Sequence, residues 1–146
     1  MIVQIKDLNS ISITELVVVF NHAFEDYIIP IGLTKEVLES KIDHEHIQLN
    51  LSVGAFVDNN LVGFILTGVE NDNGAYSIYN AGTGVIPEYR GMNFMRQMYS
   101  FLDQNLKSIH VKQHLLEVIT TNHKAVHLYT SLGFNISRTF NIGKRK

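Results

Sequence analysis

The feature that most constrains the fold is a run of three strand-like stretches in the middle of the chain. LSVGAFV (51–57) and LVGFILTGV (61–69) are rich in β-branched and aromatic residues, and AYSIYNAGTGV (75–85) follows them. Asp58-Asn59-Asn60 separates the first two stretches, and the segment from Glu70 to Gly74 separates the last two. Such residues favour turns, and short turns join antiparallel strands. The centre of the chain is therefore predicted to be an antiparallel sheet.

Helices and further strands are expected on both sides of this run. Ser12-Ile-Thr-Glu15 is a capping-box pattern, so a helix should start there and run to about Asp26. Thr34 can cap a second helix. The other expected elements are a strand at 2–6, a helix from Gly91 to about Lys107, a strand at 114–120, a short helix from Asn122 to Leu132 with left-handed Gly133 after it, and a strand at 134–140.

The order of these elements predicts a mixed sheet. The stretches 75–85 and 114–120 are joined through a helix, which predicts a right-handed parallel βαβ unit beside the antiparallel strands. The interior glycines Gly82 and Gly84 indicate a bulge, or a close approach of something to that backbone. We expect an α/β (α+β) fold with helices on both faces of the sheet, in a single domain spanning residues 1–146.

Composition excludes several classes of function. The formal net charge of -2 gives no electrostatic footprint for nucleic acid. The sequence has no cysteine, which excludes disulfides, cysteine metal sites and a cysteine nucleophile. The longest apolar run, 16–20, is too short to span a bilayer, and the N-terminus does not resemble a signal peptide. We expect a cytoplasmic protein with no nucleic-acid or membrane partner.

The stretch VIPEYRGMNFMRQM (85–98) reads as a strand end, a tight turn and the start of a helix. Backbone N–H groups at a helix start lack intrahelical partners, and together with the helix dipole they form an anion site. Gly91 suits the turn, and Arg90 adds a positive charge beside it. On these grounds alone, an anion-binding corner and an ordinary turn are equally good interpretations.

Two motifs give the chain a family resemblance. V-x-P-E-Y-R-G (85–91) is followed by L-E-V (116–118) and then N-x-x-A-x-x-L-Y-x-x-x-G-F (122–134). These motifs, in this order, resemble those of the GNAT superfamily of acyl-CoA-dependent N-acyltransferases, and the resemblance extends over roughly residues 2–140. It implies a mixed, mostly antiparallel sheet of six to seven strands, in which the parallel fourth and fifth strands splay apart around the cofactor.

The resemblance also implies an acetyl-CoA site. Backbone groups near Thr83, Gly84 and Val85 would pair with the pantetheine amides, and the missing side chain at Gly84 would help that approach. Asn122 would help to fix the cofactor. The pyrophosphate would lie on backbone N–H groups of Arg90, Gly91, Met92, Asn93, Phe94 and Met95.

Tyr129 matches the family's common general acid, which would reprotonate the leaving thiolate of CoA. Glu117 matches a glutamate that acts as base in one branch of the family, where an ammonium must lose a proton before it attacks. The alternatives are a core tyrosine and a glutamate that is only a structural hydrogen-bond acceptor. With no cysteine for an acyl intermediate, direct attack by a primary amine in a ternary complex is expected.

The acceptor is expected to be a small-molecule amine or an amine of a protein. Residues between the first two expected helices, including Asp26, would overhang the active site in this fold, and Tyr79 and Asn80 would flank it. The alternative function is a non-catalytic acyl-CoA-binding or regulatory module. The resemblance also allows a homodimer through paired edge strands.

The loop after Arg90 departs from the family pattern Gln/Arg-x-x-Gly-x-Gly/Ala, because Asn93 and Met95 replace the two small residues. Asparagine visits the left-handed conformation more readily than most residues, so Asn93 can stand in for glycine. Met95 could crowd the phosphates or could point into the core. The sequence leaves both alternatives open.

No metal site is expected. His123 and His127 are four residues apart, but Lys124 stands where zinc proteases have a glutamate, and no third ligand is evident. The G-T-G at 82–84 lacks the rest of a dinucleotide-binding fingerprint.

Overall fold

The computed structural model describes residues 1–26, 32–109, 111–115, 127–128 and 130–133. The chain divides into two compact units, Met1–Leu115 and Leu116–Lys146, which are described separately. The elements of the first unit are β1 (Val3–Asp7), α1 (Ile13–Ala23), α2 (Lys35–His44), β2 (Val53–Val57), β3 (Asn60–Asp72), β4 (Ala75–Val85), the 3-10 helix η1 (Pro87–Tyr89), α3 (Phe94–Leu106) and β5 (Val111–Leu115).

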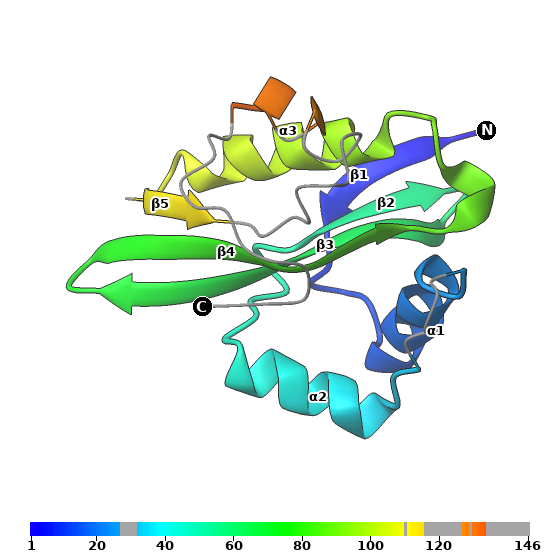
Figure 1. Ribbon diagram of the computed structural model, residues 1–146, viewed down its shortest axis with the longest axis horizontal. Helices are drawn as coiled ribbons and strands as arrows, with labels where there is room; N and C mark the ends of the chain where they lie inside the picture. Colours follow the sequence, from blue (N-terminus) through cyan, green and yellow to red (C-terminus); the bar gives the residue numbers. More distant parts are fainter. Residues whose placement is uncertain (27–31, 110, 116–126, 129, 134–146) are drawn as a thin grey trace. The chain divides into compact units, whose positions relative to one another are not determined.

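The strands form one mixed sheet in the order β1-β2-β3-β4-β5, shown in Figure 1. The first three pairings are antiparallel, and β4 and β5 are parallel. The predicted antiparallel arrangement of the three central strands and the predicted parallel pairing are therefore confirmed, and β5 begins at Val111, three residues earlier than expected. Five strands lie among the described residues, fewer than the six to seven expected, and the strand expected at 134–140 lies outside those residues.

The two hairpins are held by short turns of left-handed residues. Asp58 and Asn59 have φ angles of 48° and 69°, as a two-residue turn requires. The second turn is shorter than predicted, because β3 continues to Asp72 and only Asn73 and Gly74, at φ 54° and 87°, form the bend. The polar residues 70–72 pair across to β4, so they extend the hairpin instead of forming a loop.

Both N-terminal helices begin at their predicted caps. The Ser12 hydroxyl accepts a hydrogen bond from the Glu15 N–H at 3.1 Å, and the Thr34 hydroxyl accepts one from the Val37 N–H at 3.1 Å. These bonds satisfy backbone donors that have no partner within the helix. α1 ends at Ala23, three residues before the expected Asp26, and the Phe24 N–H closes a tighter turn on Asn21.

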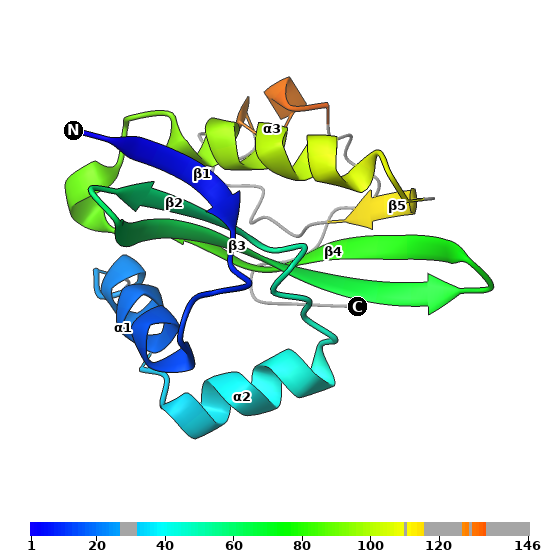
Figure 2. The same ribbon diagram turned by 180° about the vertical axis from the view of Figure 1, so that it is seen from behind.

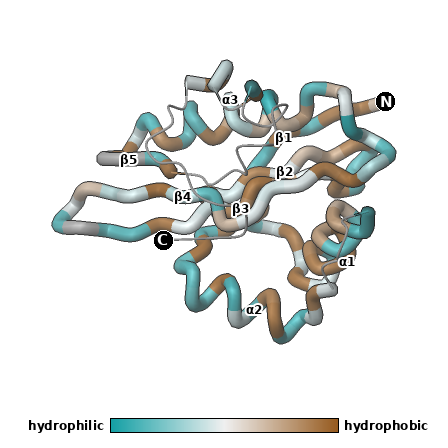
Figure 3. Tube along the Cα trace, in the orientation of Figure 1, coloured by the Kyte–Doolittle hydropathy of each residue, from teal (hydrophilic) through white to brown (hydrophobic). Residues whose placement is uncertain are grey.

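The helices lie on both faces of the sheet, as Figures 1 and 2 show from opposite sides. α1 packs through Phe20, whose ring stacks on Phe64 of β3 with centroids 5.2 Å apart. α3 covers the other face, where the Met98 side chain lies against Gly63. Figure 3 shows hydrophobic residues concentrated along the central strands, between these two layers. No helix of the described part is long and apolar enough to cross a membrane.

A bulge interrupts β4 at the position that its glycines indicated. Leu66 pairs with Gly82 and Thr67 with Asn80, so Ala81 is an extra residue without an opposite partner. Gly82 has a φ of 157°, which favours glycine. The bulge lies immediately before the end of β4 that leads into the predicted binding turn.

The second unit is described only around the end of a helix. The Leu132 N–H donates to the Leu128 carbonyl at 3.1 Å, and the Gly133 N–H donates to the Thr130 carbonyl at 3.0 Å. Gly133 has a φ of 98°. This is the left-handed C-terminal residue that the sequence predicted.

Candidate functional site

The turn between β4 and α3 has two residues in the left-handed region. Gly91 has a φ of 78° and Asn93 a φ of 63°. Asn93 occupies the N-cap position, directly before the first residue of α3. Asn93 therefore supplies the backbone geometry that the sequence expected of it. α3 begins at Phe94, three residues later than predicted, because η1 and this turn occupy the preceding residues.

The backbone N–H groups of the turn are available to a ligand. Among the described residues, no acceptor bonds to the N–H groups of Gly91, Met92, Asn93, Phe94 or Met95. The Asn93 side chain makes no capping bond at the start of α3. The first three residues of this set are exposed. Consecutive exposed N–H groups at a helix start, with left-handed residues among them, can hold an anion.

The side chains of the turn divide between core and surface. Phe94 is 3% exposed and anchors the first turn of α3 in the core, next to the Tyr89 ring. Met95 is half-buried, so it is neither in the core nor fully at the surface.

The backbone groups at the end of β4 alternate between the side of β3 and the opposite side. The Ile86 N–H donates to the Val62 carbonyl at 2.9 Å. Because antiparallel pairing alternates, Gly84 then directs its backbone groups toward Phe64, and Thr83 and Val85 direct theirs to the opposite edge. The described pairing of β4 with β5 covers only Tyr76 to Tyr79. Thr83 and Val85 thus lie beyond that pairing.

Gly84 is a place where a helix approaches the β4 backbone closely, one of the alternatives that the interior glycines indicated. A Cβ at this position would lie 3.0 Å from the Ala23 Cβ and 3.2 Å from the Phe64 ring. The end of α1 therefore lies close against β4 at Gly84, where a larger side chain would be tightly packed.

The bulge in β4 is held by Asn80. Its side-chain oxygen accepts from the Gly82 N–H at 2.8 Å, and its amide nitrogen lies 2.5 Å from both the Thr83 hydroxyl and the Tyr99 hydroxyl. Tyr99 is 1% exposed and belongs to α3. Sequence reasoning placed Asn80 near the site but missed Tyr99, although its spacing of five from Phe94 and three from Leu102 puts it near the buried face.

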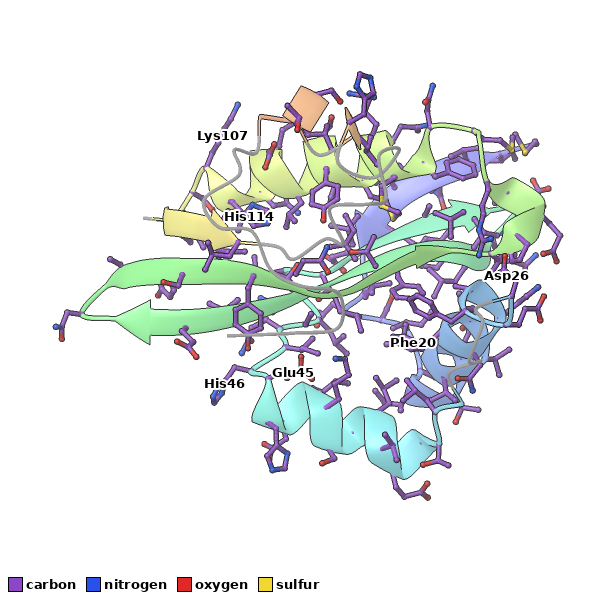
Figure 4. The ribbon with its side chains drawn as sticks, in the orientation of Figure 1. Phe20, Asp26, Glu45, His46, Lys107 and His114 are labelled. Atoms are coloured by element: carbon purple, nitrogen blue, oxygen red, sulfur yellow. The ribbon has the colours of Figure 1, made fainter. Side chains whose placement is uncertain are left out.

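The Arg90 side chain is bonded to protein groups. Its Nε donates to the Val85 carbonyl at 3.0 Å, and Nη2 donates to the Ala23 carbonyl at 2.7 Å. Nη1 and Nη2 donate to the two carboxylate oxygens of Asp26, at 2.5 and 3.1 Å. Hydrogen bonding to Arg90 lowers the pKa of the Asp26 carboxyl below its ordinary value. In Figure 4, Asp26 lies at the end of α1.

His114 of β5 lies beside the buried Tyr99, and Figure 4 shows it between β5 and α3. The two rings have their centroids 6.3 Å apart. Burial lowers the pKa of His114 below its ordinary value, and Asp103 opposes part of that effect. The neutral form of the His114 imidazole is therefore favoured, next to Tyr99 and its hydrogen bond with Asn80.

A family model described as the acetyltransferase (GNAT) family matches residues 13–134. The chain belongs to this family. The N–H groups of the turn after β4 and the parallel β4–β5 pair thus occur in a chain of a family of acetyltransferases. No curated protein sequence was found to match.

Solved structures of GNAT proteins share the fold. The ribosomal-protein-S18-alanine N-acetyltransferase of Escherichia coli is similar with a TM-score of 0.75 and 20% identity, over 94% of this chain and 80% of that one. Naa50 of Arabidopsis thaliana, in complex with the bisubstrate analogue CoA-Ac-MVNAL, is similar with a TM-score of 0.69 and 19% identity, over 93% of this chain and 85% of that one. The PaiA N-acetyltransferase of Thermoplasma acidophilum, in complex with coenzyme A, is similar with a TM-score of 0.69 and 19% identity, over 96% of this chain and 94% of that one.

Three residues expected in this GNAT site are not described. Glu117, Asn122 and Tyr129 lie outside the described residues, so their roles stay predictions. The structure does bring together the other predicted residues, at the end of β4 and in the turn that follows. Asp26 and Asn80, which the sequence placed around the site, help to hold that backbone in place, and the structure adds Tyr99.

Metal ligands are not gathered in the described part of the chain, where no group of three or more histidine, aspartate or glutamate residues could hold a metal ion. His127 is exposed, and His123, its expected neighbour, lies outside the described residues.

Proposed function

We propose that the protein is an N-acetyltransferase that moves an acetyl group from acetyl-CoA to a primary amine. The observation that carries this proposal is the row of backbone N–H groups from Gly91 to Met95, at the start of α3, to which no acceptor among the described residues bonds, in a chain of the GNAT family. A diphosphate needs several donors together with a positive electrostatic potential, and a helix start supplies both.

The cofactor would extend from this turn along the edge of β4 that faces away from β3. The diphosphate would accept hydrogen bonds from the turn between Gly91 and Met95, because the Arg90 N–H already donates to the Pro87 carbonyl. The pantetheine amides would pair with backbone groups of Thr83 and Val85. Support for this comes from the alternation of β4, which directs those two residues away from β3. Gly84 would contribute by allowing α1 to pack closely beside this edge, and Asn122 would hold the cofactor from beyond the fifth strand.

The chemistry would be a direct attack. The amine nitrogen forms a bond to the thioester carbonyl carbon, and the carbon–sulfur bond breaks. Glu117 accepts the proton that the ammonium loses before it attacks, and Tyr129 donates a proton to the leaving thiolate. The attacking nitrogen loses its second proton as the amide forms, and this proton restores the Tyr129 hydroxyl. The Val85 N–H would stabilise the thioester oxygen as negative charge develops on it.

The acceptor class stays open between a small amine and a protein amine. Among the similar structures, one is named for the alanine of a ribosomal protein and another for aminoglycosides. Since both kinds occur among structures of similar fold, a test must include both.

A second candidate is a GNAT-fold module that binds acyl-CoA without turnover. Met95 favours it, because this half-buried side chain replaces a small residue of the family's loop beside the proposed phosphate position.

Two assays test the proposal. Acetyl-CoA is expected to raise the melting temperature, because a ligand that binds only the native state stabilises it. CoA thiol release should then appear with one acceptor of a panel of N-terminal peptides, lysine peptides, polyamines and aminoglycosides. Stabilisation without release on any amine would favour the binding module, and the absence of stabilisation would contradict both candidates.

A further inference from the structure

The Arg90 side chain connects three parts of the structure at the entrance to the proposed cofactor turn. All three guanidinium nitrogens donate hydrogen bonds, to the Val85 carbonyl, the Ala23 carbonyl and the Asp26 carboxylate. Val85 is the last residue of β4, and Ala23 is the last residue of α1. One side chain thus ties the end of a strand and the end of a helix to the backbone of the turn.

Each of these acceptors is suited to a cation. The carbonyls at a helix C-terminus lack intrahelical partners and carry the negative end of the dipole, so an arginine there is favourable. The Asp26 carboxylate is bonded through both oxygens, a geometry that fixes the guanidinium plane as well as its position. The packing of Ala23 against Gly84 holds the end of α1 next to the strand that Arg90 joins.

A second contact joins α1 to η1, the 3-10 helix between β4 and the turn. His22 Nε2 of α1 lies 3.0 Å from the Glu88 carboxylate of η1 and 3.4 Å from that of Glu25. The end of α1 and the residues just before the turn are therefore connected at two places.

A guanidinium held in this way is not free to neutralise a phosphate, because a bond to the cofactor would require it to leave Asp26. We propose that Arg90 is a positioning residue, which Asp26 and the end of α1 hold in place so that the following turn presents its N–H groups to the CoA diphosphate. The inference rests on the proposed function. It differs from the expectation that Arg90 supplies positive charge to the anion.

The two roles predict opposite effects when Asp26 is replaced. Asp26→Asn removes a negative charge near an anionic ligand and releases the guanidinium. If Arg90 bound phosphate directly, this change would leave the CoA dissociation constant unchanged or lower it. If Arg90 positions the turn, the dissociation constant rises, by about tenfold if one hydrogen bond to a charged group is lost.

The test is calorimetric titration of CoA into the wild type, Asp26→Asn, Arg90→Lys and the double variant. The positioning role predicts weaker binding in both single variants and no further loss in the double variant, because both changes disrupt one unit. Glu45→Gln is the matched control, since it removes one charge from the Lys41–Glu45 ion pair at the C-terminal end of α2, and it should bind as the wild type does.

The outcomes separate this inference from the proposed function. A wild type that binds no CoA would overturn both. A wild type that binds CoA, with Asp26→Asn binding as well or better, would overturn the positioning role alone. Both side chains of the Asp26–Arg90 pair are partly exposed, at 50% and 42%, so Asp26→Asn is expected to fold even if Arg90→Lys does not, and it then decides the question by itself.

Discussion

Tyr129→Phe is expected to lower kcat by roughly 10²- to 10⁴-fold, the usual contribution of a positioned proton donor or acceptor. The substitution removes the hydroxyl that would protonate the leaving thiolate and keeps the ring, so the packing around it should change little. The dissociation constant of acetyl-CoA is expected to stay the same, since the hydroxyl acts during bond cleavage and contributes little to the bound ground state. Thiol release at saturating acetyl-CoA and calorimetric titration measure the two quantities.

Tyr76→Phe is the matched control for this variant. Tyr76 lies on the β3–β4 hairpin, near the Asn73–Gly74 turn, and removal of its hydroxyl group should leave kcat unchanged. Wild-type kcat in Tyr129→Phe would show that Tyr129 is not the general acid. A lower kcat accompanied by a lower melting temperature would instead indicate that Tyr129 is a core tyrosine, the alternative that the sequence left open.

Asn93→Asp is expected to weaken CoA binding at least about tenfold while leaving folding stability unchanged or slightly raised. The substitution keeps the shape of the side chain and adds a negative charge where the diphosphate is proposed to bind. The same charge lies at the start of α3, where interaction with the helix dipole is favourable by about 0.3–1 kcal/mol. The affinity for CoA should therefore fall without a loss of folding stability, and the loss of affinity should shrink as the salt concentration rises.

Asn93→Gly separates charge from backbone geometry in this experiment. Glycine adopts the left-handed conformation of residue 93 without steric cost and carries no charge, so CoA affinity should match that of the wild type. Stability is measured by urea unfolding and affinity by calorimetry. An Asn93→Asp variant that binds CoA as tightly as Asn93→Gly does would place the diphosphate somewhere else.

Local signals were sufficient to predict most elements of the described fold. Ser12 and Thr34 cap the helices that the sequence assigned to them, because a cap depends on residues only three positions away. The Asp58–Asn59 turn was predictable for the same reason. The parallel pairing of β4 and β5 followed from a strand–helix–strand order, which leaves few topologies open.

Contacts between residues distant in sequence were not predictable. Asp26 and Arg90 are 64 residues apart, and no local pattern joins them, so Arg90 was interpreted as a free positive charge. The bond between Asn80 and Tyr99 depends likewise on how α3 crosses the sheet. The start of α3 was placed too early, because nothing in the apolar spacing marks the left-handed residue at 93 as the true boundary.

The candidate site was predictable where it consists of backbone. Its N–H groups follow from a strand–turn–helix pattern, and the left-handed conformation of Asn93 followed from the known tolerance of asparagine. The roles of Glu117, Asn122 and Tyr129 rest on the family resemblance alone, and the described residues do not include them.

A crystal structure of the protein with CoA bound tests the central claim most directly. The diphosphate is expected within hydrogen-bonding distance of backbone N–H groups between Gly91 and Met95, with the Met95 side chain clear of the phosphates and the Arg90 guanidinium still bonded to Asp26. A diphosphate bound away from this turn would contradict the proposed site. A diphosphate bonded to the Arg90 side chain, with Asp26 released, would contradict the positioning role.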